Sequence, residues 1–197
     1  MSQSNARRSG RQGRVTKKKN NTPLIIGGVA VGLIIAAAAI FSFTNSNGPA
    51  VGTQIDDSGP SLHLQTPNDP LPVPYNSNPP TSGYHWGGGV APWGVQTKPI
   101  SDTITVHNIE HGGVIIHYRE GLDQPMIDKL SDLTRDLQRQ NPCIILVPRP
   151  SATLDVPIAL TAWNYLLKLD AFDEASVRGF FKAHVGRGPE AVCQPIS

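Results

Sequence analysis

One uninterrupted apolar segment constrains this chain more than any other feature of its sequence. Residues 24–43 read LIIGGVAVGLIIAAAAIFSF and contain no charged side chain. A helix of about 20 residues, rising about 1.5 Å per residue, matches a bilayer hydrocarbon core of about 30 Å. The segment therefore predicts one transmembrane helix. Gly28 and Gly32 form a small-xxx-small pair, which is typical of helix faces that pack against another membrane subunit.

The charges around this segment predict its orientation. All seven Lys and Arg residues before Pro23 occur without an acid, whereas the rest of the chain has ten basic residues against fifteen acidic ones and carries −5. Positive flanks stay on the cytoplasmic side. We therefore expect residues 1–23 to form a basic cytoplasmic tail on the lipid surface, residues 24–43 to cross the cell membrane, and the remainder to be extracytoplasmic. Attraction to lipid accounts for the basic tail, so no nucleic acid partner is expected.

A cleaved signal peptide is the alternative for the apolar segment. The small residues Ala36–Ala39 offer a cleavage site. However, the basic leader is long, and the apolar run continues through Ile40, Phe41 and Phe43, beyond a typical h-region of about 7–15 residues. The anchored helix is the preferred prediction, and both alternatives export the rest of the chain.

The exported part is long enough for one domain with a core of its own. Residues 44–62 are rich in Ser, Asn, Gly, Asp and Pro, and they predict a flexible spacer before a domain at 63–197. Cys143 and Cys193 are the two cysteines of the chain. In an oxidising compartment this even number predicts a disulfide bond. Two buried thiols are the alternative.

A long segment at 69–94 is dense in Pro, Gly and aromatic residues. It contains too many helix and strand breakers for a helix or a central strand. Its aromatic side chains carry too much apolar area for a disordered linker, so we predict an ordered loop over the core. Trp86 and Trp93 in this loop are candidate contacts with a partner subunit.

Hydrophobic periodicity predicts the elements that follow the loop. Alternating residues indicate a hairpin of two strands, 103–108 and 114–118, followed by a helix at 124–139 with Asp123 as its cap, strands at 143–148 and 157–163, and a helix at 173–183 capped by Asp173. The order ββαββα predicts an α+β sandwich, with a mostly antiparallel sheet and its helices on one face.

Histidines gather in one part of the sequence. Five of the six, His63, His85, His107, His111 and His117, lie between positions 63 and 117. Four residues of extended strand would separate His107 from His111 by about 13 Å, so in the predicted hairpin they can share a metal only by approaching through its turn, which Gly112 and Gly113 permit. With Glu110, they offer the nitrogen and oxygen ligands that suit zinc, copper(II) or non-haem iron.

The residues at 107–111 also satisfy H-x-x-E-H, the inverted zinc-protease pattern. That pattern requires a helix, whereas the residues before it favour a strand and two glycines follow it, so we discount the match. Hydrogen bonds that hold the hairpin and its covering loop are the alternative role for these side chains. The separation of the imidazoles in the folded chain distinguishes a metal site from this alternative.

Several classes of site are missing from the sequence. It has no phosphate-binding loop, no nucleophile elbow and no dinucleotide fingerprint, so no nucleotide or organic cofactor is evident. Met126 is the one methionine after the apolar segment, and it lies on an apolar face of a predicted helix. A methionine-rich copper(I) carrier is therefore not expected.

Three motifs resemble those of a known family. They are N-P-P-T-S-G-Y-H at 78–85, T-V-H-N-I-E-H-G-G-V-I-I-H-Y at 105–118 and A-L-T-A-W at 159–163. Together they resemble an uncharacterised bacterial family with a domain of unknown function, often membrane anchored, over residues 60–192. The resemblance implies no activity. It implies these signature residues: Tyr75, Asn78, Pro79, Pro80, Thr81, Ser82, Gly83, His85, His107, Glu110, His111 and Gly112.

The sequence thus favours a membrane-anchored extracytoplasmic domain that binds a transition metal through His85, His107 and His111, with His63, Tyr75 or Glu110 completing the site. A non-catalytic accessory subunit of a larger membrane complex is the second hypothesis. A metal-dependent hydrolase, with Glu110 as general base, is the third. The sequence supplies no substrate, and on balance it favours a protein that is not an enzyme.

Overall fold

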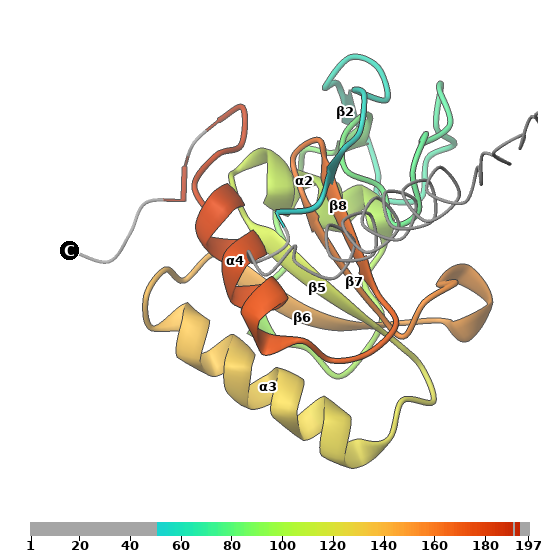
Figure 1. The fold of residues 1–197 in the computed structure, drawn as a ribbon. Coiled ribbons are helices and arrows are strands. Elements are labelled where there is room, and N and C mark those ends of the chain that lie inside the picture. The colour runs from blue at the N-terminus through green and yellow to red at the C-terminus, as the bar shows by residue number, and fades with distance from the viewer. Residues whose placement is uncertain (1–50, 191, 194–197) are drawn as a thin grey trace, which may run out of the picture. The chain divides into compact units, whose positions relative to one another are not determined.

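The computed structural model describes residues 51–190 and 192–193 (Figure 1). The predicted cytoplasmic tail and transmembrane helix, with Gly28 and Gly32, lie outside these residues. Within the described part of the chain, no helix has both the length and the apolar character needed to cross a bilayer.

A six-stranded sheet forms the centre of the domain. Its strand order is β1 (Thr53–Gln54), β8 (Tyr165–Leu169), β7 (Ile158–Ala162), β5 (Val114–Arg119), β6 (Ile144–Arg149) and β4 (Gly94–Val95). The pairings from β1 to β5 are antiparallel, whereas β6 is parallel to both β5 and β4. The α+β class is confirmed, and the sheet is mixed, with three antiparallel pairings and two parallel ones. The helix between β5 and β6 returns the chain to the same end of the sheet, which makes that pair parallel.

Helices cover both faces of this sheet, so the expected arrangement on one face is wrong. Helices α3 (Gln124–Gln138) and α4 (Glu174–His184) lie on one side, and α2 (Asp102–Glu110) lies on the other (Figure 1). Alternate residues of β5 show the division, because Ile116 packs in the core under α3 and α4 while Ile115 packs with Ile109 of α2. The predicted helices at 124–139 and 173–183 are confirmed. The Asp173 carboxylate caps α4 by accepting from the Ala175 N–H, whereas the Asp123 side chain makes no such bond.

The predicted strand at 103–108 is wrong, because these residues form α2. Seven of its nine residues are buried, polar ones included, so the sequence has no apolar stripe with a helical period. Gly112, at φ +89°, follows the helix end and takes the left-handed conformation common there. The predicted strands at 143–148 and 157–163 are confirmed as β6 and β7. Strand β8 was not predicted; it follows β7 through a tight turn in which Asn164 has φ +60°.

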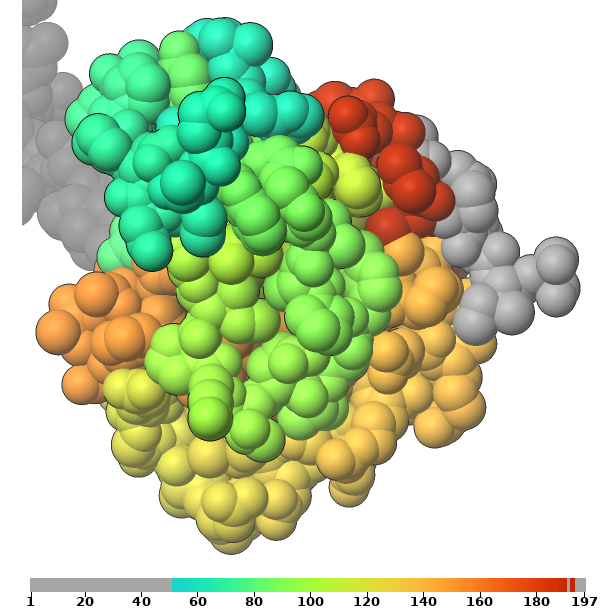
Figure 2. Space-filling model, turned by 180° about the vertical axis from the view of Figure 1, so that it is seen from behind, coloured from blue at the N-terminus to red at the C-terminus, as the bar shows by residue number. Residues whose placement is uncertain are grey.

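Two loop regions wrap the α2 side of the sheet. Part of the predicted spacer at 44–62 is folded, because β1 pairs with β8 and Ser58 is buried. The ordered loop predicted at 69–94 is present, with Thr81, Ser82 and His85 buried. Strand β2 (His63–Leu64) pairs in parallel with β3 (His85–Trp86). Figure 2 shows these segments in cyan and green covering the molecule on the side away from α3 and α4.

A segment after α4, which we call the C-terminal strap (residues 186–190 and 192–193), lies against the end of α2. Its backbone N–H groups at Gly186, Glu190 and Cys193 donate to the carbonyls of Gly112, Glu110 and His111 at 2.8, 3.2 and 3.0 Å. Cys193 is joined to Cys143 by the predicted disulfide bond, with a Cα–Cα distance of 5.8 Å. The strap therefore satisfies carbonyls that the end of a helix leaves unpaired.

Candidate metal centre

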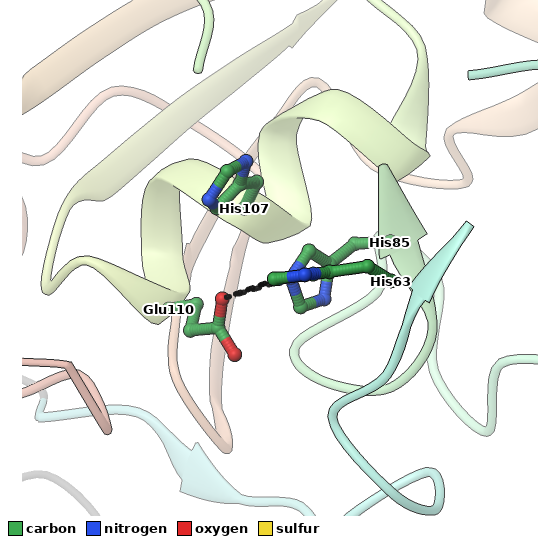
Figure 3. Close-up of side chains that lie close together, drawn as sticks. All are labelled: His63, His85, His107 and Glu110. Atoms are coloured by element: carbon green, nitrogen blue, oxygen red, sulfur yellow. Dashed lines mark ion pairs between the residues drawn. The ribbon is translucent and has the colours of Figure 1, made fainter. Parts of the chain in front are cut away.

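Four side chains from three elements meet beside the end of α2. His63 comes from β2, His85 from β3, and His107 and Glu110 from successive turns of α2. One donor atom of each lies within 4.8 Å of the others. Figure 3 shows the three imidazoles and the carboxylate grouped between the short β2–β3 ladder and the helix. Two ligand atoms bound to one zinc ion at about 2.0–2.1 Å lie roughly 3.3 Å apart, so modest side-chain movement brings this set to one ion.

Backbone carbonyls orient the two buried imidazoles. His85 Nδ1–H donates to the Gly83 carbonyl at 2.9 Å, and His107 Nδ1–H donates to the Gly89 carbonyl at 3.1 Å. A carbonyl oxygen can only accept, so each Nδ1 carries a proton. In the neutral ring, Nε2 then has an unshared lone pair. Metal-binding histidines are commonly oriented by this same kind of bond.

The two oxygens of the Glu110 carboxylate have different neighbours. Its Oε1 accepts a hydrogen bond from the Ser61 hydroxyl. Its Oε2 lies 2.8 Å from His85 Nε2 and 3.9 Å from His63 Nε2. Although His85 Nε2 and Glu110 Oε2 are close, they are not aligned for a hydrogen bond, and both buried atoms lack a hydrogen-bond partner in the part of the chain that the structure describes. Two lone-pair-bearing atoms at this distance repel each other unless one cation binds both.

Burial keeps part of the cluster in the form that binds metals. It lowers the pKa of His107 below its ordinary value, although the hydrogen bond to Gly89 opposes the shift and the nearby histidines add to it. Neutral imidazole is the metal-binding form. His63 differs from the others, because 52 % of its side chain is exposed while those of His85 and Glu110 are buried. The site is therefore closed by protein on one side and open to solvent at His63.

A second donor set shares two members with the first. His107, Glu110, His111 and Glu190 also place one donor atom each within 4.8 Å of one another. His111 follows α2 directly, and its Nε2 lies 2.8 Å from Glu190 Oε2 on the strap. The predicted trio of His85, His107 and His111 is therefore divided, with His107 lying in both sets.

Tyr75 does not belong to either set. Its hydroxyl donates to the Tyr84 carbonyl at 2.7 Å. Burial, and secondarily the Asp102 carboxylate, raises the pKa of Tyr75 well above its usual range. A tyrosine binds metal as the phenolate, so this environment opposes a role as ligand.

The remaining predicted residues, and His184 as well, are not members of either donor set. Trp93 packs against the core under α2, and Trp86 is half-buried. His117 is buried in β5 with its Nε2 3.1 Å from the Thr161 hydroxyl, and His184 donates from α4 to the Val51 carbonyl at 2.6 Å. Each of these two histidines thus forms a hydrogen bond outside the donor sets.

Sequence reasoning missed Ser61 and Glu190. Ser61 falls in the predicted spacer, where no pattern marks it. The predicted disulfide bond could have indicated the position of Glu190. Cys143 precedes β6, and its carbonyl accepts from the Val114 N–H at the start of β5, which follows α2. Bonding Cys193 to Cys143 therefore brings the residues before Cys193 to the end of α2.

The geometry also changes the interpretation of H-x-x-E-H. His107 and Glu110 lie on a helix, which was the condition missing from the predicted hairpin. Because β2 and β3 supply His63 and His85 as further donors, the site has a His₃Glu set that could hold a metal ion. Such a set suits borderline divalent transition metals.

Comparison with known proteins identifies a family. Residues 68–195 match the family model described as Protein of unknown function (DUF3105), which confirms the resemblance to an uncharacterised family. No curated protein and no solved structure matches the chain. Because the match covers more than half of its length, the chain belongs to the DUF3105 family of proteins of unknown function.

Proposed function

We propose that this domain binds one transition-metal ion through His63, His85, His107 and Glu110. The observation that carries the proposal is that His85 Nε2 and Glu110 Oε2 lie buried and 2.8 Å apart, and that neither has a hydrogen-bond partner among the described residues. The two atoms are close enough for an ion pair with a protonated His85, but they are not aligned for the hydrogen bond that such a pair would form. A metal ion offset from the line between these atoms satisfies both lone pairs and those of the other two imidazoles.

The donor set selects among metals. Three imidazole nitrogens and one carboxylate oxygen suit Zn²⁺, Cu²⁺ or non-haem Fe²⁺. Both cysteines of the chain are in the disulfide, so no thiolate favours Cu⁺. Magnesium and calcium prefer oxygen ligands throughout, and they are disfavoured at a site with three nitrogens.

The proposal includes the location of the site. We infer that the domain is anchored to the membrane on its extracytoplasmic side, with the apolar segment at 24–43 as anchor. The uncharged length of that segment and the disulfide bond support this placement. Protease added to intact cells should remove the domain and leave the basic tail protected; a tail cleaved under the same conditions contradicts the topology.

Metal content tests the function directly. Full-length protein purified in detergent is stripped with chelator, loaded with Zn²⁺ or Cu²⁺, and analysed for bound metal. We expect tight binding in the wild type and a loss of at least about 100-fold in affinity for Glu110→Gln and for His85→Gln. His184→Gln is the matched control, because it removes a buried imidazole outside the cluster. Equal metal content in all four proteins contradicts the proposal.

Two other hypotheses remain less well supported. Glu110 contacts Ser61 and His85 and lies in both donor sets, so we assign it to coordination rather than to the role of a general base in hydrolysis. The accessory-subunit hypothesis depended partly on Trp86 and Trp93 as exposed contacts. Their partial burial weakens that argument, and the hypothesis stays a prediction.

A further inference from the structure

His111 and Glu190 form a second pair of donors immediately beside the proposed ion. The rings of His107 and His111 are 4.5 Å apart, and His111 Nε2 lies 2.8 Å from Glu190 Oε2. We infer that the site holds a second divalent transition-metal ion at His111 and Glu190, with the Glu110 carboxylate bridging the two ions. This inference rests on the proposed function, which supplies the first ion.

Glu110 is the residue able to bridge. His107 has one nitrogen available, because its Nδ1 donates to Gly89, and one imidazole nitrogen binds one ion. A carboxylate has two oxygens and about four lone-pair directions. Oε2 faces His85 and His63, and Oε1 accepts from Ser61. One carboxylate oxygen of Glu110 also lies within 4.8 Å of donor atoms of His111 and Glu190, and the lone pairs that Ser61 does not occupy are free for the other ion.

The charges are consistent with two cations. Glu110 and Glu190 bring two negative charges, and the other donors are imidazoles that bind in the neutral state. One carboxylate for each ion leaves each a net positive centre with positions open to water or an anion. The exposed fraction of the His111 side chain is 21 % and that of Glu190 is 46 %, so the second position is also accessible to solvent.

The C-terminal strap holds Glu190 in place for this role. Glu190 N–H donates to the Glu110 carbonyl, so the two carboxylate-bearing residues are joined through their backbones. A Cβ atom on Gly188 would lie 2.0 Å from the Glu110 carbonyl oxygen, so a glycine is required where the strap crosses the helix end. The disulfide at Cys193 fixes the strap beyond Glu190. Together these contacts position Glu190 beside His111 before any ion binds.

The number of ions bound distinguishes this inference from the proposed function. Full-length protein in detergent is stripped, saturated with Cu²⁺ and freed of excess metal, and bound copper is measured by elemental analysis. Electron paramagnetic resonance then reports whether the Cu²⁺ ions are magnetically coupled. The variants are Glu190→Gln and His111→Gln, with Glu174→Gln and His184→Gln as controls on the surface and core of α4.

We expect two coupled ions per chain in the wild type and both controls, and one uncoupled ion in Glu190→Gln and in His111→Gln. Thermal unfolding and an intact disulfide establish that each variant is folded. If the wild type binds a single uncoupled ion that Glu190→Gln leaves in place, the second site is excluded and the proposed function stands. If neither protein binds copper, both the inference and a copper site at His85 fail.

Discussion

The two faces of the central sheet are covered by different kinds of residue. Under α3 and α4, fifteen buried hydrophobic side chains form the larger core. On the side of α2, five buried hydrophobic side chains lie beside buried polar ones, among them His85, His107, Asn108 and Glu110. The first face gains most from the removal of apolar area from water. The second face buries groups that reduce stability unless they have partners.

This difference indicates a division of roles between the faces. The core under α3 and α4 supplies most of the hydrophobic stabilisation, and the domain can therefore tolerate a polar cluster on the other face. Substitutions on the two faces should therefore affect different properties of the protein. Those under α3 and α4 should change the free energy of unfolding but not metal affinity, whereas those beside α2 should change metal affinity more strongly.

The largest expected effect is on the apolar face. Phe180 is fully buried in α4, and Phe180→Ala should lower the free energy of unfolding by about 3–5 kcal/mol because it removes an aromatic side chain and leaves a cavity. Urea denaturation measures the loss. The folded fraction should bind metal with wild-type affinity. Val73→Ala, at a position 41 % exposed, should change stability by less than about 0.5 kcal/mol. A comparable loss of unfolding free energy in both variants would contradict the assignment of stability to the core under α3 and α4.

Removal of the disulfide should have the next largest effect. Its two cysteines are 50 residues apart, and in the chain-entropy model a loop of this size contributes about 4 kcal/mol, with typical measured values of about 2–4 kcal/mol. The double variant Cys143→Ala plus Cys193→Ala should lose this stability in urea denaturation. It should also lose the second copper ion, because the strap is released, while the first remains. Retention of both ions would show that the strap is fixed without the disulfide.

Metal binding should stabilise the domain through the α2 side. At a free metal concentration of 100 times the dissociation constant, an ion that binds the folded state alone adds about 2.7 kcal/mol to the free energy of unfolding. Glu110→Gln should abolish this gain, while the exposed Glu120→Gln should retain it. Thermal denaturation with and without Zn²⁺ measures the difference. An equal gain in Glu110→Gln would place the bound ion elsewhere.

Acid should destabilise the metal-free protein, in part through His117. Burial, aided by Arg149, lowers the pKa of His117 well below its ordinary value of 6.5. Below pH 6.5, His117 binds a proton in the unfolded chain but stays neutral in the folded chain. The free energy of unfolding therefore falls as the pH falls, by up to about 1.4 kcal/mol per pH unit. His117→Gln should reduce this slope between pH 6.5 and 5 in urea denaturation. An unchanged slope would mean that other groups control the acid sensitivity.

The smallest predicted effect concerns Ser61. Its hydroxyl donates to Glu110 Oε1, and Ser61→Ala should weaken binding of the first ion by about 10-fold because the carboxylate loses a bond that orients it. Calorimetric titration with Zn²⁺ measures the change. Ser77→Ala, which removes a hydroxyl bonded to the Pro79 carbonyl, is the control and should leave affinity unchanged.

Elements with a clear hydrophobic period were predictable from the sequence. The helix α3 and the strands β5, β6 and β7 each present an apolar face or run to a core, and the pattern shows it. Helix α2 was not predictable in this way because it is buried nearly all round, and its Thr, Val and Ile residues favour strands. Packing between the sheet and the covering loops overrides that local preference.

The candidate site was predictable in composition but not in arrangement. His63, His85, His107 and Glu110 were all named as candidates, because imidazoles close together in a sequence are unusual and chemically specific. Their division into two sets depends on the parallel pairing of β2 with β3 and on the path of the strap. Both are long-range features that local sequence does not encode. Glu190 therefore remained unrecognised although its residue type is a common ligand.

His63 lies at the rim of the proposed site with about half of its side chain in solvent, while His85, His107 and Glu110 are buried. The buried ligands are held by hydrogen bonds to Gly83, Gly89 and Ser61 and have little room to move away. An ion bound at the proposed site would therefore exchange its bond to His63 for water first as it leaves. At the proposed site, the exposure of His63 would set how fast a metal ion exchanges, whereas the three buried side chains would set how tightly it is held.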